Sequence, residues 1–118
     1  MENGFNEKGS IMSIITNDTE QLIRAEAAMK QVIDPEIGLK VDDLGLIYQL
    51  DFDPAEMTLF CSMTLTSRFC PMGEAIHSGV ENSLQQAFPE YKINVSLAFD
   101  PPWNPERISV AGREFLNQ

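Results

Sequence analysis

Cys70 is the residue of this chain whose type and position best suit chemistry. It directly precedes Pro71, and proline suits the first turn of a helix, so Cys70 is predicted to be the N-cap of a helix that ends near Phe88. A helix N-terminus carries partial positive charge and unpaired N–H groups, which favour the thiolate that attacks electrophiles or binds metal. Arg68 can add positive charge. The sequence therefore predicts a reactive cysteine, catalytic or metal-binding, with a small buried hydrophobe as the alternative.

Two further groups of polar residues have types that suit a functional site. Asp34 and Glu36 flank a proline in a loop, where paired carboxylates could ligate a metal ion or act as acid and base. The same pair could form a helix-ending turn with solvated charges. Thr66 and Ser67 follow a predicted strand and approach Cys70, where their hydroxyls could hydrogen-bond a ligand or the thiolate. These four residues are candidate site residues.

Trp103 lies in a proline-rich loop, residues 100–105, that is expected to be stiff and extended. Its indole could cover a cleft or plug the core. Cys61, in the middle of an apolar strand face, is expected to be structural, and His77, beside the apolar stripe of a helix, is expected to be a surface residue. The sequence has no Ser-His-Asp set, glycine-rich phosphate loop or Cys-x-x-Cys motif, so the standard catalytic and nucleotide-binding signatures are excluded.

Two more helices are predicted from residue spacing and caps. The first begins at Asn17, which forms a capping-box pattern with Glu20, and continues with apolar residues at helical spacing until Asp34-Pro35 ends it. The last covers residues 110–116 and has Ser109 as its cap.

Alternation of apolar and polar residues predicts three strands, over residues 46–52, 57–65 and 92–99. The short turn at Asp53-Pro54 makes the first two strands an antiparallel hairpin. Amphipathic helices on one face of a three-stranded mixed sheet give a two-layer α/β sandwich of the α+β class, in the order α-β-β-α-β-α.

Length, charge and cysteine usage limit the classes of partner and compartment. A chain of 118 residues is expected to form one domain, here residues 17–118 behind a flexible leader at residues 1–16. Met12, within that leader, is an alternative to Met1 as the start of translation. The net charge of −10 disfavours nucleic acid and anionic membranes as partners. Two cysteines without a signal peptide or a membrane span indicate the cytoplasm.

Four motifs, in this order, resemble the SufT/PaaD-type iron–sulfur assembly family, whose eukaryotic relatives belong to the cytosolic iron–sulfur targeting machinery. The motifs are Asp34-Pro35-Glu36, then Leu44-Gly45-Leu46-Ile47-Tyr48, then Met63-Thr64-Leu65-Thr66 with Cys70-Pro71, then Asp100-Pro101-Pro102-Trp103. The resemblance spans about residues 18–116. It implies a two-layer α/β fold and an accessory factor in iron–sulfur cluster assembly, a SUF-type function, rather than an enzyme.

The resemblance also assigns residue roles. The reactive cysteine of the family falls on Cys70, and its pocket carboxylates fall on Asp34 and Glu36. Its hydroxyl positions fall on Thr66 and Ser67. Many members have two threonines there, so Ser67 is a departure that keeps the hydroxyl.

Ligand chemistry limits how Cys70 can act. An iron–sulfur cluster usually needs four protein ligands, so one cysteine per chain can give iron or a cluster only transient contact, with none bound stably. Further ligands would come from a second chain in a homodimer, from carboxylates, or from a client apo-protein, and assembly proteins and clients are the expected partners. Two alternatives stay open: a thiol enzyme with Cys70 as nucleophile, and a metal-free adaptor that docks proteins through Trp103 in the pocket.

Overall fold

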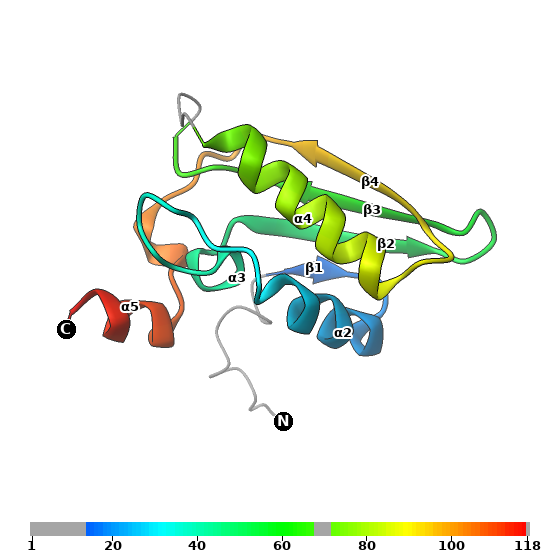
Figure 1. The fold of residues 1–118 in the computed structure, drawn as a ribbon, viewed down its shortest axis with the longest axis horizontal. Helices are drawn as coiled ribbons and strands as arrows, with labels where there is room; N and C mark the ends of the chain where they lie inside the picture. Colours follow the sequence, from blue (N-terminus) through cyan, green and yellow to red (C-terminus); the bar gives the residue numbers. More distant parts are fainter. Residues whose placement is uncertain (1–13, 68–71, 118) are drawn as a thin grey trace.

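A four-stranded mixed sheet forms one layer of the molecule (Figure 1). The computed structural model describes residues 14–67 and 72–117. β1 is parallel to β2, β2 is antiparallel to β3, and β3 is parallel to β4. In spatial order the strands are β1 (Ile15–Thr16), β2 (Ile47–Asp53), β3 (Thr58–Met63) and β4 (Lys92–Leu97).

Helices cover one face of this sheet. The described residues contain α2 (Thr19–Met29), α3 (Val41–Leu44), α4 (Gly73–Ala87), the 3-10 turn η2 (Pro105–Arg107) and α5 (Val110–Leu116). α2 and α4 contact each other over the same face of the sheet, and the short helix α3 contacts α5 at the end where β2 begins (Figure 1). The predicted two-layer arrangement of the α+β class is confirmed.

The sheet has one strand more than the sequence predicted. Ile15 and Thr16, which the sequence assigned to the leader, pair in parallel with Gln49 and Leu50 of β2, and Ile14 before them is buried. A strand of two residues is too short to produce a period-two pattern. The predicted three-stranded sheet and the order α-β-β-α-β-α are therefore wrong, whereas the antiparallel hairpin of β2 and β3 is confirmed.

Helix α2 has Asp18 as its cap, one residue later than predicted. The Asp18 carboxylate accepts the Gln21 N–H at 3.1 Å. Asn17, the predicted cap, instead bonds both backbone groups of Phe52 in β2, donating from Nδ2 at 2.8 Å and accepting at Oδ1 at 2.9 Å. The Asn17 side chain therefore ties the start of the helix to the sheet.

Helix α4 begins later than the sequence predicted. Its first residue is Gly73 and its cap is Met72, so the prediction that Cys70 is the N-cap is wrong. Cys70 itself falls in the segment 68–71, outside the described residues. Helix α4 therefore gives no direct support for activation of this thiol by a helix terminus, since its cap lies two residues further along the chain.

A β-bulge at Tyr48 changes which side chains of β2 face the core. Ile47 lies opposite Met63 and Gln49 lies opposite Ser62, so Tyr48 is an extra residue in its strand. Ile47 is fully buried and Tyr48 is half-buried. The alternation predicted from sequence placed Tyr48 on the apolar face, and the bulge moves it away from that face.

The core fills the space between the helices and the covered face of the sheet. Four residues of the apolar stripe predicted for the second helix, Ile76, Val80, Leu84 and Phe88, are buried against β2, β3 and α2, whereas its fifth, Met72, is exposed at the cap of α4. The central members are Leu22, Met29, Leu50, Phe52, Leu59, Cys61, Met63, Ile76, Val80, Leu84 and Phe88.

Candidate functional site

The carboxylate of Asp34 organises a tight turn between α2 and α3. The residue is 1% exposed, and its Oδ1 accepts the Glu36 N–H at 2.9 Å. The Asp34 carbonyl accepts the Gly38 N–H at 2.7 Å, and the Asp34 N–H donates to the Leu39 carbonyl at 2.8 Å. Helix α2 has already ended at Met29. Asp34 therefore holds a turn of its own, with Glu36 exposed at its surface.

The segment that follows β4 is fastened to the residues that precede β2. Trp103 Nε1 donates to the Leu44 carbonyl at 2.6 Å, and Arg107 Nε donates to the Gly45 carbonyl at 2.7 Å. Gly45 has a φ of 72°, and a Cβ there would lie 2.6 Å from the Arg107 carbonyl oxygen, so the close approach requires glycine. Two motifs that are far apart in the sequence thus form one physical unit.

Tyr48 adds a further connection to the same segment. Its hydroxyl donates to the Pro101 carbonyl at 2.8 Å. The Arg107 guanidinium lies over the Tyr48 ring, 4.4 Å from its centroid, in a cation–π contact. The bulge in β2 directs Tyr48 to this side of the sheet. The bulge, the glycine and the arginine together hold the chain from Pro101 to Arg107 in place.

A small hollow, called here the Trp103 hollow, lies against this fastened segment and has a volume of about 120 Å³. Thr66 and Trp103 are half-buried and Ser67 is exposed. Three predicted site residues therefore meet at one place, whereas Asp34 and Glu36 are not among the lining residues. Trp103 packs against the core as well as lining the hollow, so it does both things that its sequence context suggested. The lining residues are Leu65, Thr66, Ser67, Phe99, Pro102 and Trp103.

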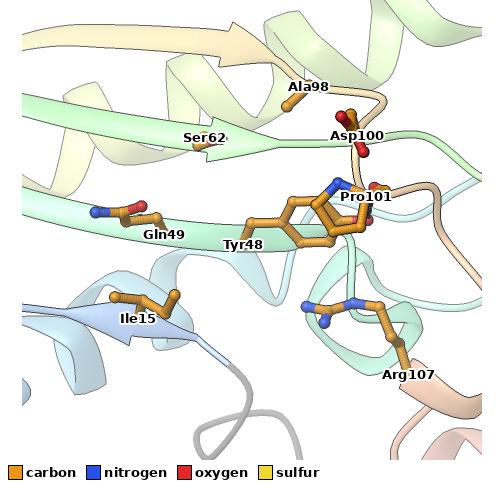
Figure 2. Close-up of a pocket in the computed structure, with 8 residues that line it drawn as sticks. All are labelled: Ile15, Tyr48, Gln49, Ser62, Ala98, Asp100, Pro101 and Arg107. Atoms are coloured by element: carbon orange, nitrogen blue, oxygen red, sulfur yellow. Dashed lines mark hydrogen bonds between the residues drawn. The ribbon is translucent and has the colours of Figure 1, made fainter.

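A larger pocket, of about 280 Å³, opens on the face of the sheet that α2 and α4 do not cover. Figure 2 shows Gln49 and Ser62 on neighbouring strands, with Asp100 and Arg107 on either side of the Tyr48 ring. The chain after β4 serves both sites: Ala98, Asp100 and Pro101 line this pocket, and Phe99, Pro102 and Trp103 line the hollow.

Of the two cysteines, the structure describes Cys61. Cys61 is 2% exposed in β3, and burial raises the pKa of its thiol to about 12. The prediction that Cys61 is structural is confirmed, because such a thiol stays protonated at neutral pH. Cys70 lies outside the described residues; in the sequence it comes three residues after Ser67 of the hollow and two before Met72.

Polar groups elsewhere in the described chain are engaged in the fold. Within residues 14–67 and 72–117, no three His, Cys, Asp or Glu side chains come close enough to hold a metal ion. Lys30 Nζ donates to the buried Asp42 carboxylate at 2.6 Å, and this hydrogen bond raises the pKa of Lys30 above its usual 10.5. His77, expected at the surface, is half-buried and donates from Nε2 to the Val95 carbonyl at 3.0 Å.

Arg107 is a residue of this region that the sequence did not predict. Its carbonyl partners, Gly45 and Ile47, lie about sixty residues earlier in the chain, and no spacing rule connects residues at that separation. The motif that contains Gly45 and Tyr48 is marked in the sequence only by the family resemblance. No pattern in the residues around Arg107 points to this role.

Residues 23–97 match the sequence model of a protein family described as iron–sulfur cluster assembly protein. The maturation auxiliary factor YitW of Bacillus subtilis is 39% identical to this chain over 83 residues, which cover 70% of this chain and 79% of that protein. The maturation auxiliary factor SufT of Staphylococcus aureus is 37% identical over 78 residues, which cover 66% of this chain and 88% of that protein. Both names specify iron–sulfur proteins as the objects of maturation.

Solved structures also match the fold. A domain of unknown function from Bacillus anthracis superposes with a TM-score of 0.74 at 35% identity, covering 80% of this chain and 90% of that one. A conserved hypothetical protein from Thermotoga maritima gives a TM-score of 0.69 at 36% identity, covering 81% and 93%. None of the helices in the described residues has the length and apolar character needed to cross a membrane.

Proposed function

Since the chain belongs to the iron–sulfur cluster assembly protein family, we propose that it is an accessory factor in the maturation of iron–sulfur proteins. The match over residues 23–97 carries this proposal, because it includes β2, β3, β4 and the sequence around Cys70. The partners are then other assembly proteins or client apo-proteins. We place its action in the cytoplasm, where thiols stay reduced.

Cys70 is the residue through which this factor would act. The other thiol of the chain, Cys61, is buried and has its pKa raised to about 12, so it is a poor ligand at neutral pH. A single thiolate can make contact with iron or a cluster in transit but cannot hold a cluster by the usual four bonds. The remaining ligands would come from the client that receives the cluster or from a second chain.

The Trp103 hollow would give this contact its surroundings. Thr66 and Ser67 bring two hydroxyls to it, and Phe99 and Trp103 bring aromatic surface. Hydroxyl donors stabilise thiolate and sulfide, while aromatic walls limit access of water to them. The fastening of Trp103 to the Leu44 carbonyl keeps the wall in place between one client and the next.

Asp34 would contribute by shaping the chain rather than by binding iron. Its Oδ1 is committed to the Glu36 N–H, and its burial leaves no path for a ligand without opening the turn. A thiol enzyme would need a base beside its nucleophile. The residues expected as that base are Asp34 and Glu36: Asp34 is buried in its turn, Glu36 is exposed, and neither lines the Trp103 hollow that includes Ser67.

Deleting the gene and restoring it with variants tests the proposal. The deletion should lower the activity of iron–sulfur enzymes in that cell, most strongly under aerobic and iron-poor growth, and the wild-type gene should restore it. Cys70→Ala should fail to restore activity. Cys61→Ala is the matched control, because it removes the other thiol of the chain, which is buried in the core.

The outcomes separate the function from its mechanism. Unchanged enzyme activities in the deletion strain under both growth conditions would contradict the accessory function itself. Full restoration by Cys70→Ala would leave the function standing and remove the thiol from its mechanism. Restoration by neither cysteine variant would require a check that both proteins accumulate, by immunoblot of the same cultures.

A further inference from the structure

Strand β4 forms one edge of the sheet and is bordered on its outer side by no other described strand (Figure 1). It is six residues long, whereas β1 at the opposite edge has two. Proteins usually protect long edges with lysine or another charged residue, proline, or a bulge, because a bare edge pairs with other chains. Lys92, at the first position of β4, is the one charged residue of the strand; from Ile93 to Leu97 there is neither charge nor proline, and the parallel register with β3 runs without a shift.

The hydrogen bonds at both ends of β4 fix which of its backbone groups face outward. Lys92 N–H donates to the Met57 carbonyl at 2.8 Å, and Ala98 N–H donates to the Met63 carbonyl at 2.7 Å. Successive residues of a strand direct their backbone groups to alternate sides. Asn94 and Ser96, which lie between those two ends at alternate positions, therefore also direct their backbone N–H and C=O groups to β3.

Ile93, Val95 and Leu97 consequently direct their N–H and C=O groups to the open edge. Among the described residues one of these groups has a partner: the Val95 carbonyl accepts the His77 Nε2–H at 3.0 Å from helix α4. Leu97 is 42% exposed, so apolar surface accompanies the free backbone groups at this end of the strand. The edge offers the pattern of donors and acceptors that an extended peptide can match.

The end of β4 leads to the Trp103 hollow. Two residues beyond Leu97, Phe99 lines that hollow. A strand paired with β4 would therefore run along the sheet to the same end at which Thr66, Ser67 and Trp103 meet. A cysteine in such a strand would arrive near the proposed site of cluster contact, which is where a client must supply its ligands.

Negative charges near the β4 edge favour a basic partner over a second copy of this chain. Glu74 and Glu81 lie about one helical turn before and after His77 on α4, and both are exposed. The chain as a whole carries a net charge of −10. A second copy of this chain would bring equal negative charge to the edge, which opposes pairing, whereas a basic segment is attracted.

We propose that the β4 edge binds an extended basic segment of a client protein by adding it as a fifth strand, with its end at the Trp103 hollow. This proposal rests on the proposed function for the identity of the client, but its physical content, backbone pairing at Ile93, Val95 and Leu97, can be tested without any iron–sulfur protein. Main-chain hydrogen bonds would supply most of the affinity, so the interaction should tolerate many side-chain sequences.

Amide hydrogen exchange followed by NMR on the full chain is the test. The probe is a short acetylated peptide amide in which lysine alternates with valine around one central cysteine. Saturating peptide should slow exchange at Val95 and Leu97 by about tenfold or more, because paired amides exchange only when the pairing opens. A peptide with glutamate in place of lysine, and a basic peptide N-methylated at every residue so that neither edge keeps its N–H groups, should leave these rates unchanged.

Two variants of one residue provide the matched control. Leu97→Pro removes an outward N–H and leaves the bonds to β3 intact, since proline is tolerated where an edge N–H faces solvent. It should weaken peptide binding about tenfold or more, while Leu97→Val, which keeps the N–H, should bind within about twofold of wild type. His77→Ala exposes the Val95 carbonyl and should bind at least as well as wild type.

Several results would overturn the proposal. They are unchanged exchange at Val95 with the basic peptide, equal binding of the acidic peptide, equal binding by Leu97→Pro, and loss of binding in His77→Ala. Edge amides that are protected without peptide, together with a doubled mass in light scattering, would assign the edge to a second copy instead. Each of these leaves the deletion test of the proposed function untouched, so the two can fail separately.

Discussion

Replacing Asp34 distinguishes a carboxylate that holds the fold from one that does chemistry. Asparagine keeps an oxygen that can accept the Glu36 N–H, whereas alanine removes the acceptor. If Asp34 acts through its turn, Asp34→Asn should fold and function nearly as wild type and Asp34→Ala should be destabilised. If Asp34 were a metal ligand or a base, both variants would lose function, because each lacks the negative charge.

The size of the effect follows from the contacts of the side chain. Asp34 is 1% exposed and accepts one N–H at 2.9 Å. A hydrogen bond to a charged group contributes about 1.5–3 kcal/mol, and the Glu36 N–H can be partly rehydrated because that residue is exposed, so about 2 kcal/mol is expected for alanine. For a domain of this size that lowers the melting temperature by roughly 8 °C. Asparagine should cost below about 1 kcal/mol.

Urea denaturation followed by circular dichroism, together with restoration of the deletion strain, checks both halves of this prediction. Glu36→Gln serves as the control, because it changes a carboxylate in the same turn that is exposed. An Asp34→Asn protein with wild-type stability and no ability to restore enzyme activity would contradict a role through the turn and show that the negative charge itself is needed. An Asp34→Ala protein as stable as wild type would also contradict a role through the turn.

Three other predictions test separate parts of the structure. Iodoacetamide at neutral pH should modify one thiol per native chain and none in Cys70→Ala, because Cys61 is 2% exposed and its thiol has a pKa of about 12. Mass spectrometry counts the adducts, and a second adduct on the native protein would contradict the burial of Cys61. The hydrogen bond to Asp42 raises the pKa of Lys30 above 10.5, so its stabilisation is present below that pH and is lost as the pH rises through the folded-state value. As the pH rises above 10.5, the free energy of unfolding from urea titrations should therefore fall more for wild type than for Lys30→Met. The difference should stay below about 1 kcal/mol, because the Lys30 side chain is half exposed. An equal fall in both proteins would contradict this prediction. Gly45→Ala should lower the free energy of unfolding by about 2 kcal/mol or more, because the φ of Gly45 is 72° and the new Cβ would lie 2.6 Å from the Arg107 carbonyl oxygen. An unchanged urea midpoint would contradict this prediction, since it would show that the backbone at Gly45 can move to accept a Cβ.

Elements with strong periodicity could be predicted from the sequence. The alternation at residues 57–65 corresponds to β3, and α5 runs over Val110–Leu116 with Ser109 as its cap, as predicted. In both cases the signal is local, because the pattern of burial or the capping side chain lies within the element itself. The Ser109 hydroxyl accepts the Gly112 N–H at 3.0 Å, three residues away.

The errors arose where distant residues decide the local structure. Asn17 has the sequence context of a cap but bonds Phe52, which lies thirty-five residues later, and the cap passes to Asp18. Tyr48 fits an alternating strand until the register with β3 inserts it as a bulge. Neither partner can be read from the local sequence.

The candidate site was predictable only in part. Thr66, Ser67 and Trp103 were selected by residue type and by the resemblance, and they line one hollow. The resemblance also grouped Asp34 and Glu36 with them, but a motif shared within a family can support the fold as well as the chemistry. Arg107 carries no local signal at all, although it fastens the wall of that hollow through the Gly45 carbonyl.

The most direct measurement of the central claim is the cluster content of a client. An iron–sulfur enzyme would be purified anaerobically from cells with and without the gene, and its iron and acid-labile sulfide would be measured per polypeptide. Occupancy should be lower in the deletion strain at equal polypeptide abundance, and it should be restored by wild type and by Cys61→Ala but not by Cys70→Ala. Equal occupancy with and without the gene, under aerobic and iron-poor growth, would contradict this prediction.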